Sequence, residues 1–255
     1  MNKTVKNILL RISILLGIVV FIGLMVMAKI NRDKSKIKTI RVEIDDLNGL
    51  FFTNEEQVLT TLNNRFDVLG KNLSGKSLDK IERSLYIIPQ VKSANAFTDD
   101  QGNLNIKIIQ RVPLFRVYNL QGNSFYVDEH KIKFSTTPNF TANVPIVNGK
   151  IIERMDSTQQ QIQAVELKRV YRIIKAVQEN KVWNALIGQY YINEKNQIEL
   201  IPRFGTATIL VGDDKNIEQK LKQLEVFYFD VLKKVGWNYY KVINIMYKNQ
   251  VVCLK

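Results

Sequence analysis

A run of seventeen residues without a charged side chain, Ile12–Ala28, constrains the fold of this chain more than any other feature. A membrane-spanning helix needs about 17–25 mostly apolar residues, so the run is at the short end of that range. The apolar core of a cleaved signal peptide is shorter, about 7–15 residues, although Val26 and Ala28 fit a small-residue cleavage site. The length favours an uncleaved transmembrane helix over a signal peptide, and the rest of the chain must fold apart from it.

The positive charge of the chain is concentrated around this run. Of the net charge of +13, residues 1–41 carry +8, from nine Lys and Arg side chains against one acid, Asp33. A basic chain can indicate nucleic-acid binding. Basic residues that flank an apolar run instead indicate a membrane surface as the anionic partner, so we expect no nucleic acid.

The same charges bear on orientation. Lys and Arg are enriched on the cytoplasmic side of a membrane helix. Three precede the run (Lys3, Lys6 and Arg11) and five follow it within residues 29–38. Taken alone, this count favours a cytoplasmic location for the large C-terminal part.

Residues 37–112 have the pattern of a small α+β domain with the element order β-α-α-β-β. Its strands alternate apolar and polar residues, and its helices carry start and stop signals. The expected elements are a strand over Ile37–Ile44, a helix behind a Thr53–Glu56 capping box, a helix after Ser77 that Pro89 ends, and two strands joined by a polar turn at residues 99–103.

Residues 113–255 predict a mostly antiparallel sheet with two packed helices. Short apolar segments punctuated by Gly and Asn do not alternate regularly with helices, which argues against a doubly wound parallel sheet. In the first helix, Val170, Ile173, Ile174 and Val177 lie at helical spacing. The second is expected over Asn216–Val235, with an apolar stripe of Ile217, Leu221, Leu224, Tyr228 and Val231 and Gly236 as its C-terminal cap.

Little in the sequence indicates catalysis. A single histidine, His130, and a single cysteine, Cys253, leave no disulfide framework and no two-histidine metal site. We expect His130 in an exposed turn and Cys253 as a small apolar side chain. No carboxylate pair or nucleophile–base set stands out, so we expect no catalytic residues, no metal and no cofactor.

One motif resembles a nucleotide site. "GKNLSGKS" (Gly70–Ser77) matches the phosphate-loop pattern, in which Lys76 would meet phosphate charge and Ser77 would bind magnesium. Such a loop needs a buried strand directly before it, and the preceding "NNRFDVL" contains Arg65 and Asp67. The context favours a loop capped by Ser77, and a nucleotide hydrolase remains the less favoured alternative.

Several stretches resemble bacterial cell-division proteins of the FtsQ/DivIB family. They are "LGKNLSGKSLDKIERSLYIIPQVKSANAF", "QRVPLFRV", "IELIPRFGTATILVGDDKNIEQKLKQLEVFYFDVL" and "INIMYKNQVV", in the family's order. Family motif positions are occupied by Gly205, Gly212, Lys220, Leu221, Phe227 and Tyr228. Asn244 and Met246 depart from the family, which often has Asp and Arg there.

The resemblance implies an architecture for the whole chain. The expected parts are a cytoplasmic tail at 1–11, a transmembrane helix at 12–28, a linker at 29–36, a POTRA domain at 37–112 and an FtsQ-type β domain at 113–255. It also implies an inner-membrane protein at the division septum with its N-terminus in the cytoplasm and its bulk in the periplasm. Because long domains translocate largely regardless of charge, we set the resemblance above the charge count.

The function that the resemblance implies is a non-enzymatic scaffold of the divisome. It would bind FtsB/DivIC-type and FtsL-type coiled-coil division proteins and help regulate the septal peptidoglycan synthase complex. A POTRA-bearing component of envelope transport or secretion is the alternative, but neither tandem POTRA domains nor a membrane barrel is visible in the sequence.

The chain ends on an apolar segment that reads as one strand, Met246–Leu254. An apolar edge strand is a liability that proteins normally blunt with charge, proline or a cover. It can instead accept a partner's strand, or the segment can lie inside its own sheet. Because Tyr247 matches a motif tyrosine in a region that the family uses for partner binding, we expect it to be an aromatic anchor. The expected site comprises Tyr247, Met246, Lys248, Asn249, Gln250 and Val251.

Overall fold

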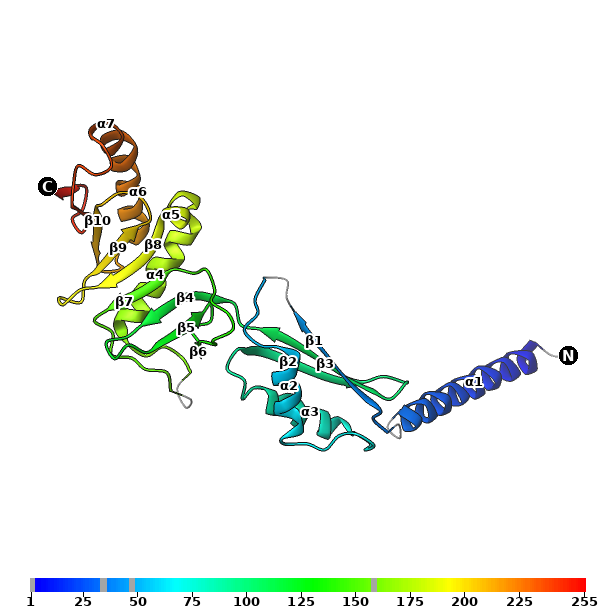
Figure 1. Ribbon diagram of the computed structural model, residues 1–255. Helices are drawn as coiled ribbons and strands as arrows, with labels where there is room; N and C mark the ends of the chain where they lie inside the picture. The colour runs from blue at the N-terminus through cyan, green and yellow to red at the C-terminus, as the bar shows by residue number, and fades with distance from the viewer. Residues whose placement is uncertain (1–2, 33–35, 46–48, 157–159) are drawn as a thin grey trace. The chain divides into compact units, whose positions relative to one another are not determined.

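The structure is a computed structural model that describes residues 3–32, 36–45, 49–156 and 160–255. It divides into two compact units (Figure 1). The first contains the described residues of 1–47 and 53–110, and the second contains those of 48–52 and 111–255. The chain therefore enters the second unit briefly before it completes the first.

Helix α1 (Lys3–Arg32) contains the apolar run. Large apolar side chains from Ile12 to Met27 are exposed, at 50–68% of their full area. In the described part of the chain, the structure has no helix with both the length and the apolar character that crossing a membrane requires. The expected linker falls partly on residues 33–35, which lie outside the described residues, and α1 continues through Lys29–Arg32.

The rest of the first unit has the expected order β-α-α-β-β. Strands β1 and β2 both pair with β3, so the sheet order is β1-β3-β2, with β1 parallel to β3. Helices α2 and α3 bury Val58, Leu62, Ile81 and Leu85 in one core with Ile106 of β3. The elements are β1 (Thr39–Asp45), α2 (Glu55–Asn63), α3 (Gly75–Leu85), β2 (Val91–Thr98) and β3 (Asn103–Gln110).

The starts of α2 and α3 differ from the prediction. Asn54, and not Thr53, caps α2: its Oδ1 accepts a hydrogen bond from the backbone N–H of Gln57 at 2.9 Å. Asn is at least as good an N-cap as Thr, so the residue one step closer to the helix takes the role. Helix α3 begins before Ser77, directly after Ser74, so the Ser77 cap is also wrong.

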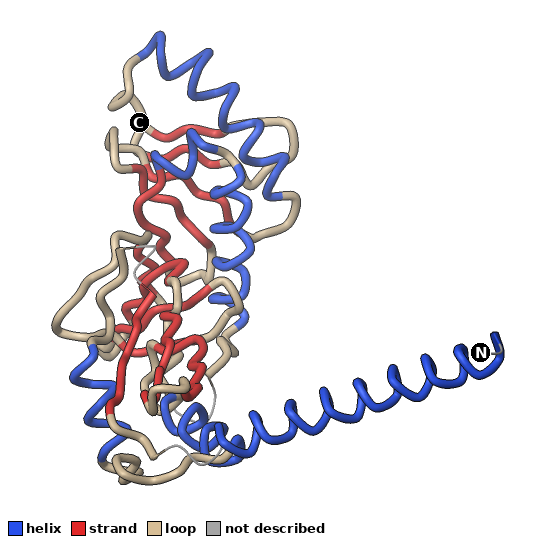
Figure 2. The backbone as a smooth tube through the Cα atoms, turned by 90° about the vertical axis from the view of Figure 1, so that its right-hand side faces the viewer, coloured by secondary structure: helices blue, strands red, loops and turns tan. Residues whose placement is uncertain are grey.

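The second unit contains a nine-stranded sheet with helices on one side of it (Figure 2). The strand order is β12-β11-β10-β9-β8-β7-β4-β5-β6, with five antiparallel and three parallel pairings among the described strands. The expected α+β fold with a large, mostly antiparallel sheet is confirmed. The elements are β4 (Pro113–Tyr118), β5 (Ser124–Asp128), β6 (Lys133–Ser135), β7 (Ile146–Gly149), α4 (Val165–Glu179), α5 (Lys181–Leu186), β8 (Ile187–Ile192), β9 (Ile198–Pro202), β10 (Thr208–Gly212), α6 (Ile217–Phe227), η1 (Tyr228–Leu232), α7 (Lys233–Val235), β11 (Val242–Asn244) and β12 (Val252–Leu254).

The helix expected over Asn216–Val235 is interrupted. A π-helical turn, η1, separates α6 from α7 and shifts the register of the buried face. Leu232 is therefore buried, whereas the predicted Val231 is only half-buried. Such turns occur mostly as single insertions in α-helices and frequently at functional sites.

A small aromatic cluster accounts for the early entry of the chain into the second unit. The ring of Phe52 lies edge-on to Tyr126, Phe134 and Phe140, with ring centroids 5.2, 5.6 and 4.8 Å away. Such arrangements are favourable because the positive ring edge faces the negative ring face. The cluster fixes the segment that ends at Phe52 against β5 and β6.

Candidate functional site

The apolar C-terminal segment is a hairpin and not one strand. The expected strand over Met246–Leu254 is wrong, because a turn at 245–251 joins β11 to β12 and only Val252–Leu254 is extended. Asn249 adopts a φ of 59°, which Asn tolerates better than most residues, and the Asn244 side chain accepts a hydrogen bond from Met246 N–H at 2.9 Å. These polar residues favour a turn where the apolar pattern suggested a strand.

The last strand lies at the edge of the sheet. Strand β12 comes first in the strand order and pairs only with β11 among the described strands. Burial of this strand in the middle of its own sheet, the alternative left open by the sequence, is therefore wrong. One side of β12 has no protein strand beside it in the described part of the chain.

The hydrogen bonds of β11 show which backbone groups of β12 face outward. The Thr208 N–H donates to the Lys241 carbonyl, and the Ile245 N–H donates to the Leu210 carbonyl. Within β11, Ile243 thus faces β10, whereas Val242 and Asn244 face β12. Lys241, just before the strand, bonds to both neighbours, since its N–H donates to the Leu254 carbonyl at 2.8 Å. In the antiparallel register Leu254 pairs with Val242, and Val252 pairs with Asn244. The N–H and C=O of Cys253 therefore point away from β11.

Met246 ties the turn to the sheet. A Cβ built on Gly212, whose φ is 79°, would lie 2.6 Å from Met246 Sδ, so only glycine leaves room for this side chain. The Gln197 side-chain amide also donates a hydrogen bond to Met246 Sδ at 3.6 Å. Where the family often has a charged Arg, this chain uses a half-buried side chain that positions the turn.

The expected site residues are brought together by the turn, but they differ in exposure. Tyr247 is 49% exposed, and Lys248, Asn249 and Gln250 are also exposed. Val251 is half-buried and packs against the main core. Met246, Tyr247 and Lys248 line a small hollow of about 60 Å³ together with α6 residues. The α6 side of the hollow comprises Asn216, Gln219, Lys220 and Gln223.

Lys220 holds the loop before α6 in place. Its Nζ donates to the carbonyls of Val211 and Asp213, each at 3.0 Å, and to Asp213 Oδ1 at 2.8 Å. Burial opposes ionisation of Asp213, but the hydrogen bond and charge of Lys220 outweigh it and hold the pKa of this carboxyl below its usual value. Sequence reasoning noticed Lys220 as a motif position but found no role for it, because its partners are backbone carbonyls.

The edge strand has one ionisable side chain, Cys253. It is half-buried, packs against the core, and burial raises the pKa of its thiol. This environment fits the expected small apolar side chain and keeps the thiol protonated. At the very end of the chain, Lys255 Nζ lies 4.6 Å from the Tyr239 ring centroid.

The phosphate-loop resemblance lacks its structural setting. The residues before Gly70 form helix α2 and a loop, and no strand runs directly into the motif in this described stretch. Lys76 is exposed in the first turn of α3. His130 is also exposed, in the turn between β5 and β6, as expected.

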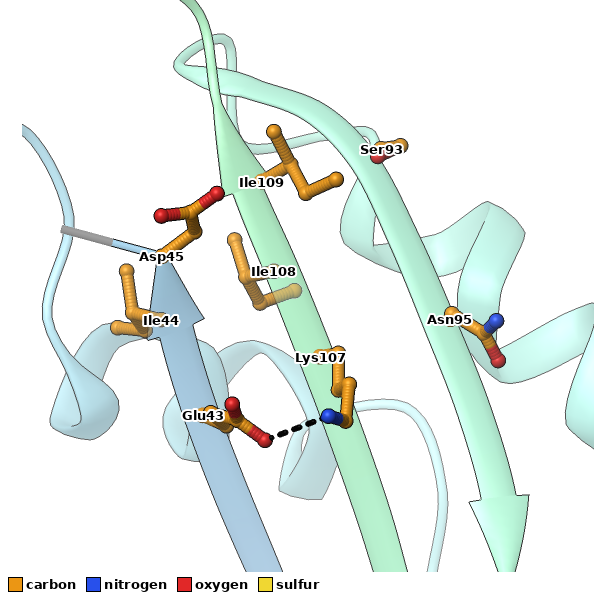
Figure 3. Close-up of a pocket in the computed structure, with 8 residues that line it drawn as sticks. All are labelled: Glu43, Ile44, Asp45, Ser93, Asn95, Lys107, Ile108 and Ile109. Carbon is orange, nitrogen blue, oxygen red and sulfur yellow. Dashed lines mark ion pairs between the residues drawn. The ribbon is translucent and has the colours of Figure 1, made fainter. Parts of the chain in front are cut away.

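The first unit has a hollow of about 470 Å³ on its sheet (Figure 3). Glu43 on β1 and Lys107 on β3 form an ion pair across it at 3.0 Å. The two charges neutralise each other, and exposed pairs of this kind contribute little to stability. No nucleophile–base arrangement accompanies them in Figure 3, so the hollow does not compete with the C-terminal edge as the candidate site.

Comparison with protein families agrees with the fold of the second unit. The model of the family described as FtsQ/DivIB, C-terminal related, matches residues 112–254, which is more than half of the chain. The chain belongs to this family. The match ends at Leu254 and so includes the terminal hairpin. No curated protein matches the chain. FtsQ/DivIB proteins are non-enzymatic division scaffolds, and membership supports a role in cell division with protein partners.

Proposed function

We propose that this chain is a non-enzymatic, membrane-anchored scaffold of the divisome. It binds FtsB/DivIC-type and FtsL-type coiled-coil proteins and helps regulate septal peptidoglycan synthesis. The observation that carries the proposal is the open edge at β12 within a domain of the FtsQ/DivIB-related family. An open edge offers main-chain hydrogen bonds to an added strand, and neighbouring side chains supply selectivity.

The partner strand would pair with the outward N–H and C=O of Cys253. Tyr247, in the adjacent turn, would anchor the partner through its half-exposed ring, with Met246, Lys248, Asn249, Gln250 and Val251 around it. Charges do not blunt this edge, since β12 itself has none and only Lys248 and Lys255 flank it. Residues of α6 beside Tyr247 would extend the interface.

The strand pairing is tested by Cys253→Pro, with Cys253→Ala as the matched control. Proline is tolerated on an edge strand where its missing N–H would face solvent, so the ladder to β11 should persist. We expect Cys253→Pro to weaken binding of a purified FtsB/DivIC-type partner much more than Cys253→Ala does. Equal affinities at equal melting temperatures would contradict strand addition.

The aromatic anchor is tested separately by Tyr247→Ala. Truncation of such an anchor at an interface typically costs at least ~2 kcal/mol of binding free energy. Tyr86→Ala is the control, because Tyr86 is exposed to a similar extent, 45% against 49%, but lies in the first unit. Affinity and melting temperature are measured side by side. Unfolding of Tyr247→Ala, or unchanged binding, would show that Tyr247 is not the anchor.

Membrane anchorage forms part of the proposal. The uncharged run Ile12–Ala28 and the exposed apolar side chains of α1 support an uncleaved anchor. The β-α-α-β-β order supports a POTRA domain, which the FtsQ-type β domain follows. We place both domains in the periplasm because the family resemblance implies this orientation. A C-terminal alkaline phosphatase fusion should be active and remain in the membrane fraction at full length. An inactive fusion would favour the orientation from the charge count, and a soluble, processed product would favour a signal peptide.

A further inference from the structure

A polar hollow lies next to the terminal turn of the second unit. It has a volume of about 310 Å³, and segments that are distant in the sequence line it. Arg169 comes from α4, Lys195 from the turn between β8 and β9, Lys220 from α6 and Met246 from the terminal turn. One carboxylate, that of Asp213, accompanies the cations in the lining. We call this feature the Arg169 hollow.

Arg169 has hydrogen-bond donors to spare. Its Nε lies 3.9 Å from Oδ1 of Asp214, which is too far for a hydrogen bond. The other oxygen of Asp214 accepts a hydrogen bond from Arg172 Nε, so two arginines share this one carboxylate. The side chain of Arg169 is 35% exposed, so a ligand can reach its guanidinium. A guanidinium with free N–H groups matches a carboxylate in both shape and charge.

Lys195 adds a second positive charge. No carboxylate of the described residues forms an ion pair with it, and its neighbour Glu194 does not line the hollow. Asn193 Oδ1 accepts hydrogen bonds from the N–H groups of Lys195 and Gln197, each at 3.0 Å. The Gln197 side chain in turn donates to Met246 Sδ. The backbone that carries this cation is therefore held in place before a ligand binds, which lowers the cost of ordering.

The Arg169 hollow thus carries an excess of positive charge. Lys220 and Asp213 form an ion pair at 2.8 Å and neutralise each other, whereas Arg169 and Lys195 remain for a ligand. Complementary charge selects an anionic group for such a surface. The volume is at the low end for ligand pockets, which measure about 300–1,000 Å³, so the hollow suits an inserted side chain better than a large ligand.

The Arg169 hollow adjoins the surface that we propose for partner binding. Lys220 and Met246 line both this hollow and the hollow beside Tyr247. A chain anchored on Tyr247 would therefore have the Arg169 hollow within reach of its neighbouring residues. This continuity favours a carboxylate of a polypeptide over a free anion or a lipid headgroup.

We propose that the Arg169 hollow binds an acidic side chain, Asp or Glu, of the partner that pairs with β12. This inference rests on the proposed function and adds a charge that the partner must carry. The guanidinium of Arg169 donates hydrogen bonds to the carboxylate, and Lys195 contributes the second positive charge. A partner with Lys or Arg at this position is disfavoured, because like charges placed together at an interface are unfavourable.

The test measures binding of a purified FtsB/DivIC-type partner to the full chain in nanodiscs of phosphatidylcholine, which has no net charge. The double variant Arg169→Met/Lys195→Met removes both free cations. The matched control, Lys168→Met/Lys175→Met, removes the same charge from α4, and neither of its residues lines either hollow. It also changes one half-buried and one exposed side chain, as the test variant does. Melting temperatures are measured side by side.

We expect the test variant to bind the partner on the order of ten-fold more weakly and with a smaller dependence on salt concentration. The control should bind as the unsubstituted chain does. If the test variant melts at a lower temperature, Lys195→Met alone, in an exposed turn, replaces it and should still weaken binding. Each Asp and Glu of the partner is then changed to Asn or Gln, and one of these changes should cost no further affinity on the test variant.

The outcomes separate this inference from the proposed function. Unchanged affinity of the test variant, equal losses in test and control, or no partner acid that couples to the hollow overturns the inference alone, and Cys253→Pro still tests the strand pairing. Absence of partner binding to the unsubstituted chain overturns both. If the test variant keeps its partner affinity but loses binding to vesicles that contain phosphatidylglycerol, the hollow binds a lipid headgroup, and the acidic side chain is the wrong ligand.

Discussion

Met246 occupies the space that a side chain on Gly212 would need. A Cβ built on Gly212 lies 2.6 Å from Met246 Sδ and 2.8 Å from its Cγ. The contact joins the end of β10 to the turn that leads into β12. The position of the terminal hairpin therefore depends on Gly212, which has no side chain and precedes Met246 by more than thirty residues.

Gly212→Ala should lower both stability and partner affinity. Its φ of 79° costs an alanine about 1–2 kcal/mol, and displacement of Met246 adds to this loss. Gly122→Ala is the matched control, because Gly122 has the same φ and no neighbouring atom within 4 Å of its Cβ position. Denaturant unfolding should show a larger loss for Gly212→Ala than for Gly122→Ala.

Met246→Ala should partly rescue Gly212→Ala. Removal of the Sδ and Cγ atoms leaves only the backbone strain, so the two substitutions should couple favourably in a double-mutant cycle. Additive losses in the free energy of unfolding would show that the two side chains do not compete for this space.

Lys133→Met should destabilise the second unit strongly. Lys133 Nζ and Glu153 Oε1 form an ion pair at 2.8 Å, with side chains only 2% and 7% exposed. The Glu153 carboxylate also accepts hydrogen bonds from Gln163 and Ala164 N–H at the start of α4. Loss of one partner of a buried pair costs about 3–5 kcal/mol because it leaves the other charge uncompensated.

The control for this substitution is Lys107→Met in the first unit. Lys107 and Glu43 form a pair of similar length, but their side chains are 52% and 71% exposed. Exposed pairs contribute about 0–1 kcal/mol. Similar losses for the two variants in chemical denaturation would contradict a special role of the buried pair.

Protonation of Asp99 should make the first unit less stable in strong acid. Hydrogen bonds from the side chain and then the backbone N–H of Asn103 are the main causes that lower the pKa of Asp99 from 3.8 to about 2. Because the folded state favours the ionised form, this stabilisation is present above pH 3.8 and is lost as the pH falls toward 2. An NMR titration of the carboxyl carbon should give a midpoint near 2, and Asp99→Asn should remove this part of the pH dependence. A midpoint at the ordinary value would contradict the hydrogen-bonded turn.

Lys76→Ala should have almost no effect. The side chain is exposed in the first turn of α3, and exposed substitutions usually change stability by less than about 0.5 kcal/mol. Calorimetry should detect no ATP–magnesium binding that depends on Lys76. Tight binding that this substitution abolishes would overturn the scaffold proposal in favour of a nucleotide hydrolase.

Local patterns predicted most elements because a helix or strand encodes its buried face in nearby residues. The stripe Val170, Ile173, Ile174 and Val177 is buried throughout, as helical spacing requires. The alternation over residues 37–44 likewise predicted β1. Helix α5 was missed, because a helix of six residues has too few positions to show a period, and only two helices were expected in this unit.

For the candidate site, too, some features follow from local sequence and others depend on contacts between distant segments. Which residues cluster at the C-terminal end follows from the sequence, because Met246 to Val251 are neighbours along the chain. Three features could not be read from local residues: the turn in this segment, the place of β12 at the sheet edge and the outward direction of the Cys253 backbone. Those features depend on pairings with β10 and β11 and on the space above Gly212, which form only when distant segments pack together. The burial of Leu232 in place of Val231 also depends on the tertiary structure. The π-helical turn inserts one residue into the helix, and an insertion of this kind changes the helical period without a signal in the apolar pattern.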